Sequence, residues 1–427
     1  MGKVNKIERA IKPEEMPNFL RQMADAIETG DSLNNKPIAT LNISKKTMNT
    51  NNMCAENIKV DPEISDEDLE IFFKVMSTEL ADWQIQQIIT PSNIYPKQKQ
   101  ILAVHWHPEF VPMNLVSQRI EAMFPNCKDE MLIPTQHNEL MSYGRYTGVE
   151  VDCYASGFNQ KVQLLLHFEN EKIEKAHVLK SMLAHTFKYR SSQLFEFMDS
   201  ITKPIEKRVH EAARKTGADK NLVEMVKIYV TKIQTMLEDN WSDISKASIK
   251  NKLLKNYFDA MRPKYGDTLI NRAQAYLKAI KSQVKTDFSL KFFYRATEII
   301  EETHGLGGCV VIPHPEEFWP ILLAKYDVDG IEAWNPQSQR YTDFLISVIN
   351  EQNANRASGS KEVFIFMGDD CHMSEKTKPV CTQDPVKAAR EIGLQPAWDD
   401  LNIRKKLIMA GIDRQSIIKD YKARLAG

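Results

Sequence analysis

Histidines stand at the ends of apolar segments in this 427-residue chain, and the first such position carries two of them. The apolar run 101–104 is followed directly by His105-Trp106-His107. Side chains alternate between the two faces of a strand, so His105 and His107 would point the same way, about 7 Å apart. Two imidazoles in this arrangement can bind one metal ion or two adjacent ions.

Further histidines and acidic residues occupy comparable strand-end positions. They are His137 in T-Q-H-N, Glu150 in G-V-E-V, His167 ending V-Q-L-L-L-H, His314 in I-P-H-P, and Asp370 and His372 in G-D-D-C-H. Imidazole and carboxylate ligands suit Zn²⁺, Mn²⁺ or Fe²⁺, and one carboxylate can bridge two such ions. Paired ions lower the pKa of a water molecule between them and stabilise a phosphoryl displacement. The residue types therefore predict a hydrolytic metal centre.

These residues need a fold that brings distant positions together. Helical patterns, including those at 293–303 and 341–350, separate several strand-like segments. The strand-like segments are 101–104, 149–154, 162–167, 309–312, 330–334 and 363–367. Alternating strands and helices predict an α/β fold with a mainly parallel sheet or barrel. In a parallel barrel the carboxyl ends of all strands open on one face, where these side chains would converge.

Two other regions are predicted to be helical. Residues 1–97 contain an amphipathic stretch at 16–27 and a helix over 65–80, for which Ser65-Asp66-Glu67-Asp68 offers a capping start. Between His167 and Thr303 the pattern is almost wholly helical, with apolar residues three and four apart. The predicted helices of this all-α insertion are 178–198, 205–215, 222–240, 249–261 and 268–284.

Charge is distributed unevenly along the chain. The formal net charge is −1, but residues 171–300 hold 25 Lys and Arg against 15 Asp and Glu, an excess of +10 that leaves −11 elsewhere. Such a basic segment could attract phosphate, whereas its interleaved acids equally fit solvated helix faces. Nucleic acid therefore ranks below a small phosphorylated substrate as the expected partner.

The order of the strand-end motifs resembles that of the polymerase and histidinol phosphatase (PHP) superfamily of metal-dependent phosphoesterases. The matching segments are His105-Trp106-His107, Thr135-Gln136-His137, Gly148-Val149-Glu150, His167, Gly307 through Pro315, Gly330 through Asn335, and Gly368 through His372. The resemblance covers about 98–170 and 290–375. It implies a distorted (β/α)7 barrel of the PHP type, with two or three divalent ions on one face.

The helical patterns and this resemblance together divide the chain into four segments. They are a mainly helical N-terminal region at 1–97, the first part of the barrel at 98–170, a long all-α insertion at 171–290, and the second part of the barrel with C-terminal helices at 291–427. An insertion at the rim of the metal face would shape access of the substrate.

One departure from the family pattern concerns the number of ions. Family members usually carry another Asp or His five or six residues after the opening HxH, where this chain has Pro112 and Met113. The number of ions is therefore predicted as two or three. Glu109, just beyond the HxH, is the carboxylate that could compensate.

The predicted site combines metal ligands with phosphate-binding groups. The predicted ligands are His105, His107, His137, Glu150, His167, His314, Asp370 and His372, with Glu150, His137 and Asp370 also as catalytic residues. Arg145 and Arg340 lie in loops near strand ends and are expected to bind substrate phosphate, because a planar guanidinium makes two contacts with it. The remaining histidines, in helical patterns or near a helix end, are expected at the surface or in the core: His177, His185, His210 and His304.

The leading prediction for function is a phosphoesterase in which a metal-bridging hydroxide attacks the phosphorus of a small phosphorylated metabolite or nucleotide. Two alternatives stay open: hydrolysis of an amide or carboxylic ester at the same site, and a regulatory protein that keeps the metal only as structure. The composition, 42% hydrophobic and 26% charged, is that of a globular chain. No run of about 18 apolar residues occurs, the N-terminus is charged and the six cysteines are scattered, so a cytoplasmic protein without a membrane segment is expected.

Overall fold

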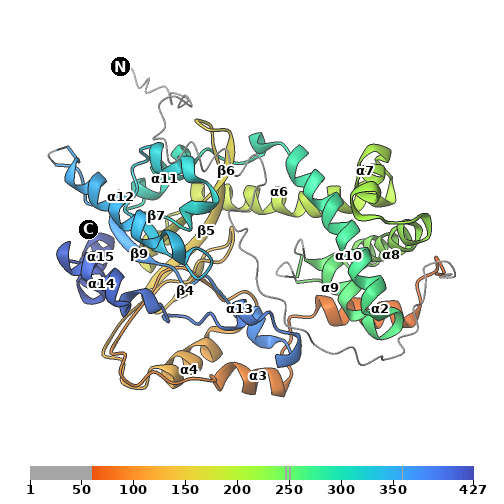
Figure 1. The fold of residues 1–427 in the computed structure, drawn as a ribbon, viewed down its shortest axis with the longest axis horizontal. Coiled ribbons are helices and arrows are strands. Elements are labelled where there is room, and N and C mark those ends of the chain that lie inside the picture. Colours follow the sequence, from red (N-terminus) through yellow and green to blue (C-terminus); the bar gives the residue numbers. More distant parts are fainter. Residues whose placement is uncertain (1–59, 246–247, 250–251, 358) are drawn as a thin grey trace, which may run out of the picture. The chain divides into compact units, whose positions relative to one another are not determined.

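The computed structural model describes residues 60–245, 248–249, 252–357 and 359–427 (Figure 1). The amphipathic stretch predicted at 16–27 lies outside these residues. The chain divides into a helical unit, drawn from the described residues of 60–77, 193–244 and 248–288, and an α/β unit, drawn from 78–192, 245 and 289–427. The mixed α/β character of the protein is as predicted.

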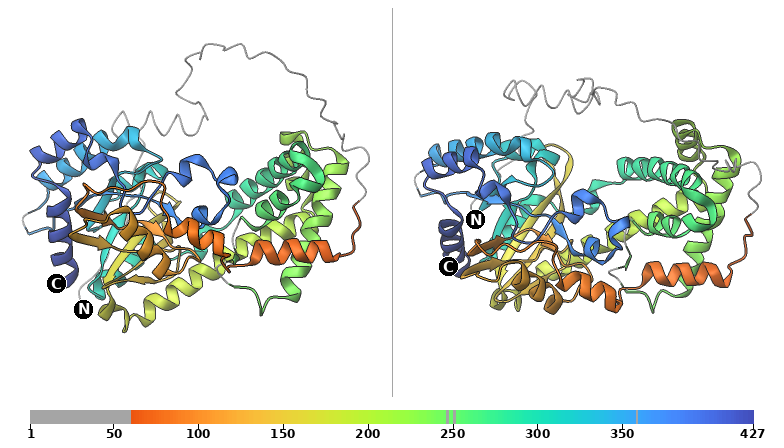
Figure 2. Two further views of the ribbon diagram at one scale, coloured as in Figure 1. Left: turned by 90° about the horizontal axis from the view of Figure 1, so that it is seen from below. Right: turned by 60° about the horizontal axis from the view of Figure 1, so that its bottom comes forward.

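The helical unit forms because amphipathic helices bury their apolar faces against one another. Its helices are α2 (Asp66–Met76), the C-terminal part of α6 (His177–Thr202), α7 (Glu206–Thr216), α8 (Lys220–Asp239), α9 (Leu253–Ala260) and α10 (Arg262–Asp287). α10 packs on α7, α8 and α9. Figure 2 shows the green helices of this unit gathered together. The predicted capping box is present, since the Asp68 amide donates to the Ser65 hydroxyl and the Ser65 amide donates to the Asp68 carboxylate.

The N-terminal helices do not form a region of their own, as the predicted boundary at 97/98 would require. α2 packs on α8 and α9, so it belongs to the helical unit. The next helix, α3 (Asp82–Ile89), belongs to the α/β unit, where it packs on α4 (Met113–Met123). Burial of the Phe72 and Met76 side chains among the helices explains the division. After α2, the helical unit begins at Gln193 and ends at Phe288, whereas the predicted insertion spans 171–290.

The strands of the α/β unit lie in three separate sheets rather than in a closed barrel. The strands are β1 (Gln100–Ala103), β2 (Trp106–His107), β3 (Asp129–Leu132), β4 (Met141–Tyr143), β5 (Tyr146–Ala155), β6 (Gln160–Glu169), β7 (Cys309–Ile312), β8 (Gly330–Trp334), β9 (Phe364–Met367) and β10 (Cys371–His372). β1 pairs with β3, β10 pairs with β2, and the six-stranded sheet has the order β4-β5-β6-β7-β8-β9.

The prediction of a mainly parallel sheet does not hold for the β4–β7 part of the six-stranded sheet. β4, β5, β6 and β7 pair antiparallel in sequence order, and only β7-β8 and β8-β9 are parallel within the large sheet. β4, β5 and β6 follow one another through short turns, which permit only antiparallel pairing, whereas β7, β8 and β9 are joined by longer crossovers. The antiparallel pairing of β6 with β7 is not set by connection length, because the long helical segment lies between these two strands. The long strands β5 and β6 are prominent in Figure 1.

Helices pack on the strands of the α/β unit. α11 (Ala296–Gly305) packs on β5 and β7, α12 (Thr342–Ala354) packs on β8 and β9, and α15 (Arg414–Ala426) packs on β1, β3, β6 and β9. The remaining helices of this unit are α5 (Asn170–Ile173), α13 (Pro385–Ala388) and α14 (Leu401–Met409), with short 3-10 turns at Leu290–Phe292, Pro315–Glu317, Trp319–Leu323, Gln339–Tyr341, Met373–Thr377, Val380–Thr382 and Pro396–Trp398. None of the helices in the described residues is long and apolar enough to span a lipid bilayer.

Candidate metal centre

Two short parallel strands place the first histidine pair beside the last one. In the pairing of β2 with β10, His107 lies opposite His372. The Asp370 amide donates to the His105 carbonyl oxygen at 2.9 Å, which extends the pairing by one step. The pairing of β2 with β10 therefore places the H-x-H and D-x-H motifs side by side.

A close approach of two backbone segments brings His137 against Glu150. The Glu150 amide donates to the Gln136 carbonyl at 3.0 Å, and the Glu150 carbonyl accepts from the Asn138 amide at 2.7 Å. A Cβ at Gly148 would lie only 2.4 Å from the Pro134 carbonyl oxygen, so the approach requires glycine there. As a result, His137 Nδ1 lies 2.5 Å from Glu150 Oε2.

The Glu332 carboxylate on β8 connects the histidines that follow β1 and β7. Its Oε1 lies 2.6 Å from His105 Nδ1, and its Oε2 accepts from the His314 amide at 2.9 Å. A Cβ on Gly368 would come within 2.2 Å of Glu332 Oε1, so this glycine makes room for the carboxylate. A carboxylate on one ring nitrogen orients a histidine so that the other can bind metal, and here His105 Nε2 is the other nitrogen.

Seven of the eight predicted ligands converge. Three groups of donor atoms each lie within 4.8 Å: His107, His137 and His372; His105, His107 and Asp370; and His105, Glu150 and His314. His107 is central, because its ring centroid lies 4.4 Å from that of His137 and 4.2 Å from that of His372. His105 and His107 each belong to two groups, so the donor sets overlap as adjacent metal positions would.

The carboxylates of the cluster are held ionised. Burial raises the pKa of Glu150, but the charge and hydrogen bond of His137, together with the hydrogen bond of His314, bring it well below its ordinary value. Burial likewise raises the pKa of Asp370, and contacts with His107, His372 and His105 bring it well below. Ionised carboxylates are the form that binds a cation.

The two histidines of the H-W-H motif have opposite titration behaviour. Burial lowers the pKa of His105, but the charge and hydrogen bond of Glu332 outweigh it and raise the pKa to about 10. Burial, with the neighbouring His372 and His137, lowers the pKa of His107 to about 3. His107 is therefore a neutral imidazole, the form that acts as a metal ligand.

Buried donor atoms without partners indicate that the cluster fits a cation. His105 Nε2 and both ring nitrogens of His107 are buried and have no hydrogen-bond partner among the residues that the structure describes. Buried polar atoms of this kind cost free energy unless a ligand satisfies them. Divalent ions bound by His105 Nε2, by one ring nitrogen of His107, and by Glu150 and Asp370 would satisfy most of them. The donor set therefore fits the predicted cofactor class, without specifying the type or number of ions.

Glu109 places a further carboxylate beside His372. Its Oε1 lies 3.7 Å from His372 Nδ1, and its Oε2 accepts from the Ser374 amide at 2.8 Å. Glu109 adopts a φ of 55°, a left-handed conformation that non-glycine residues seldom take. Pro112 and Met113 begin α4 instead. Sequence reasoning identified this carboxylate but not its direction.

Two residues that the sequence analysis missed clamp Asp370. Its Oδ2 accepts from Arg390 Nη1 at 2.5 Å and from Gln337 Nε2 at 2.6 Å. Its Oδ1 lies 3.5 Å from His107 Nε2 and 3.3 Å from His372 Nε2. One oxygen thus faces the imidazoles while the other is held by the protein. No local motif marks Arg390, because its contact with Asp370 arises only in the folded chain.

Replacing Arg390 tests this clamp. We expect Arg390→Gln to weaken metal binding by about 10–100-fold, because groups that orient a ligand typically have effects of this size. Competition with a chelating dye measures the affinity. Arg356→Gln is the matched control, since Arg356 pairs with Glu362 at the surface, 3.6 Å away. Equal affinities in the two variants would argue against the clamp.

His167 does not join the cluster, which corrects its prediction as a ligand. Its Nδ1 lies 2.8 Å from the Tyr421 hydroxyl and its Nε2 lies 3.0 Å from the Val104 carbonyl oxygen. Burial lowers the pKa of His167 to about 3, so the ring is neutral. Nε2 then donates to Val104 and Nδ1 accepts from Tyr421, which leaves no lone pair for a metal.

A substitution distinguishes a structural role of His167 from a role as metal ligand. We expect His167→Gln to keep the full metal content and to lower the free energy of unfolding by about 1–3 kcal/mol, because buried hydrogen bonds are lost. Elemental analysis and urea denaturation measure the two quantities. Loss of an ion at unchanged stability would restore His167 as a ligand.

Neither predicted phosphate-binding arginine lies in the cluster. The Arg145 side chain is 82% exposed in the turn between β4 and β5, where it pairs with Glu169 at 3.3 Å. The Arg340 guanidinium is exposed and lies 4.6 Å from the Tyr341 ring centroid. Both predictions are corrected: a loop near a strand end sets the position of a residue but not the direction of a long side chain.

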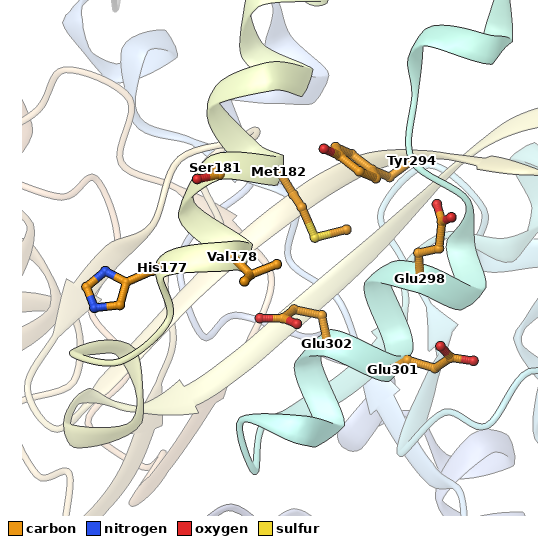
Figure 3. Close-up of a pocket in the computed structure, with 8 residues that line it drawn as sticks. All are labelled: His177, Val178, Ser181, Met182, Tyr294, Glu298, Glu301 and Glu302. Carbon is orange, nitrogen blue, oxygen red and sulfur yellow. The ribbon is translucent and has the colours of Figure 1, made fainter. Parts of the chain in front are cut away.

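The helical histidines lie away from the metal centre, as expected. His304 Nε2 is 3.0 Å from Asp329, and His185 Nε2 is 3.0 Å from the Phe292 carbonyl oxygen. His177 lines a separate cavity of about 610 Å³ between α6 and α11, where Figure 3 shows Met182 and Tyr294 near each other and Glu302 on the facing helix. None of these residues belongs to the three donor groups.

The chain was also compared with known proteins. No protein-family model matches it, and no relative is found among curated proteins. The resemblance to the PHP superfamily therefore remains a prediction from the motifs, beside a cluster of buried histidines and carboxylates that could bind metal ions.

Proposed function

We propose that this protein is a metal-dependent phosphoesterase whose catalytic unit is related to the PHP superfamily. The observation that supports the proposal is the overlap of three donor groups inside one buried cluster. Overlapping sets of imidazoles and carboxylates suit two or three adjacent divalent ions, which is the arrangement that phosphoryl transfer uses. Zn, Mn and Fe are the candidate ions.

The residues of the chain have separable tasks in this proposal. The two oxygens of Glu150 approach different imidazoles, with Oε2 3.5 Å from His107 and Oε1 3.6 Å from His314, so this carboxylate is suited to bridge two ions. Glu332 orients His105, and Arg390 holds Asp370. Bound ions would activate water as the nucleophile and neutralise charge on the phosphoryl oxygens.

Glu109 supports a third ion in this proposal. The donor group of His107, His137 and His372 contains no carboxylate, but Glu109 Oε1 lies 3.7 Å from His372. Its carboxylate would provide the negative charge that the missing ligand at Pro112 or Met113 supplies in the family. We therefore propose three metal positions rather than two.

A second candidate is hydrolysis of an amide or carboxylic ester at the same centre. The position of Arg145 and Arg340 outside the cluster favours this second reaction. A carbonyl substrate, unlike a phosphate ester, needs no additional cation to bind phosphate oxygens. The same metal and nucleophile serve both reactions.

The deciding experiment combines metal analysis with a substrate panel. The purified protein, loaded in turn with Mn²⁺, Zn²⁺ or Fe²⁺, is offered 4-nitrophenyl phosphate, its bis-ester, 4-nitrophenyl acetate and a short oligonucleotide. Phosphate-ester cleavage that disappears in Glu150→Ala supports the proposal and excludes a contaminating phosphatase. Cleavage of the acetate alone would support the second candidate. Bound metal without hydrolysis of any substrate would refute both and favour a regulatory role.

A further inference from the structure

We propose a second ligand site in the α/β unit, which binds a small organic anion through the buried guanidinium of Arg414. The site is a cavity of about 1250 Å³, and none of its lining residues belongs to the metal centre. The lining residues include Ile94, Tyr95, Lys97, Trp334, Leu394 and Arg414. The inference does not depend on the proposed hydrolase activity.

The Arg414 side chain is buried with donors unused. Only 11% of it is exposed, and its Nε and Nη2 are buried without a hydrogen-bond partner among the described residues. Nη1 lies 3.5 Å from the Gln100 carbonyl oxygen, at the limit of a hydrogen bond. The nearby carboxylate of Asp399 is 4.0 Å from Nη2 and itself 77% exposed, so it gives little compensation.

A buried arginine whose guanidinium nitrogens lack hydrogen-bond partners favours an anionic ligand. Removing a charged group from water without a partner is costly, and burial accordingly lowers the pKa of Arg414. A carboxylate or phosphate group accepts two parallel hydrogen bonds from a guanidinium, and Nε with Nη2 offer such a pair. The two unused nitrogens of Arg414 thus match one anionic group.

The guanidinium is held in place before a ligand arrives. Arg414 is the first residue of α15, which Asp413 caps by accepting from the Ser416 amide at 2.8 Å. The Arg414 guanidinium carbon lies 5.8 Å from the centroid of the Trp398 ring. Trp398 is fixed in turn, because its Nε1 donates to Gln395 at 2.9 Å. Such preorganisation reduces the entropy lost on binding.

The charges at the rim agree with an anion rather than a cation. Lys97 and Lys99 are exposed at the cavity and add positive charge. Asp400 also lines the cavity, but its Oδ1 already accepts from the amides of Asn402 and Ile403 at the start of α14. The buried charge of the cavity, that of Arg414, is therefore positive, whereas the carboxylates of Asp399 and Asp400 lie at its exposed edge.

The rest of the lining calls for an apolar body on the ligand. Tyr95, Trp334 and Leu394 contribute ring and aliphatic surface, and Ile94 is 60% exposed. The volume is also far larger than inorganic phosphate requires, since pockets of about 300–1000 Å³ hold organic ligands. An aromatic or aliphatic carboxylate or phosphate fits both features.

Binding of simple probes to the full-length, metal-loaded protein tests the site. Isothermal titration uses phenylphosphonate and benzoate, with inorganic phosphate for comparison. We expect one of the organic anions to bind saturably and more tightly than phosphate, and Arg414→Met to weaken that binding by at least about tenfold, the loss of charge-assisted hydrogen bonds. Arg404→Met is the matched control, because Arg404 is exposed on α14 and does not line the cavity.

Two further arms make the result decisive. Glu150→Ala should bind the probe as the native protein does, whereas loss of binding in that variant would place the anion at the metal centre and overturn the proposal. Absence of saturable binding to the native protein, or equal affinity in Arg414→Met, would overturn it as well. If Arg414→Met does not fold, crystals of the native protein soaked in phenylphosphonate decide: density beside Arg414 supports the site, and its absence there refutes it.

Discussion

Replacing Glu150 with alanine is expected to remove bound metal and hydrolytic activity together. The Glu150 carboxylate is buried, and its oxygens lie 2.5 Å from His137, 3.5 Å from His107 and 3.6 Å from His314. Asp370, the other carboxylate of the three donor groups, contacts His107 but shares no donor group with His137 or His314. Because removal of groups that merely orient ligands costs 10–100-fold in affinity, loss of this ligand should cost more than about 100-fold.

Elemental analysis after gel filtration measures the metal content, and release of 4-nitrophenol measures turnover. Glu362→Ala is the control, because Glu362 forms an exposed pair with Arg356. Glu150→Gln, which keeps the volume and removes the charge, should resemble the alanine variant. Full metal stoichiometry with full turnover in Glu150→Ala would refute the bridging role.

Replacing Lys232 with methionine should destabilise the helical unit by about 3–5 kcal/mol, the usual cost of leaving a buried charge unpaired. Lys232 Nζ lies 2.7 Å from Asp68 Oδ2, and both side chains are nearly inaccessible, at 5% and 6% exposure. The Tyr257 hydroxyl also donates to Asp68 at 3.2 Å. Methionine would keep the apolar stem of Lys232 and leave the carboxylate without its cation.

Urea denaturation followed by circular dichroism measures this loss. Lys203→Met is the matched control, because its pair with Asp199 is exposed and should contribute at most about 0.5 kcal/mol. Adding Asp68→Asn to Lys232→Met should recover part of the stability by removing the buried charge. A cost below about 1 kcal/mol for Lys232→Met would show that the pair is not needed.

The same pair predicts a pH dependence. Burial raises the pKa of Asp68, but hydrogen bonds from Lys232 and Ser65 outweigh it and hold the pKa below its ordinary value. A lowered pKa in the folded state gives stability that is present above about pH 4 and is lost as the pH falls through the folded pKa. In Lys232→Met burial dominates and protonation relieves the carboxylate. The difference between the two proteins should therefore shrink as the pH falls below about 4.

The sequence by itself predicted the features that depend on short-range patterns. The strands β7 and β8 have the predicted bounds, and the capping box at Ser65 is present, because side-chain alternation and helix capping involve only neighbouring residues. Seven of the eight predicted ligands come together, because their types and strand-end positions can be read from the chain.

The tertiary structure decided which side chains face the centre. His167 stands at a strand position like the others, yet Tyr421 from the C-terminal helix and the Val104 carbonyl use both of its ring nitrogens. Arg390 reaches Asp370 and Glu332 reaches His105 through contacts between distant segments, which no local motif encodes. The direction of the strands also depended on the connections between them.

Backbone conformation sets the direction of three further side chains at the metal centre. Glu109, His314 and Asp370 all adopt positive φ angles, at 55°, 26° and 44°, which are costly for non-glycine residues and persist only where surrounding contacts impose them. The side-chain direction at these three positions therefore does not follow from strand alternation. The residue types and spacing determined that a cluster of histidines and carboxylates could form, whereas packing between distant segments determined which atoms of those side chains face one another.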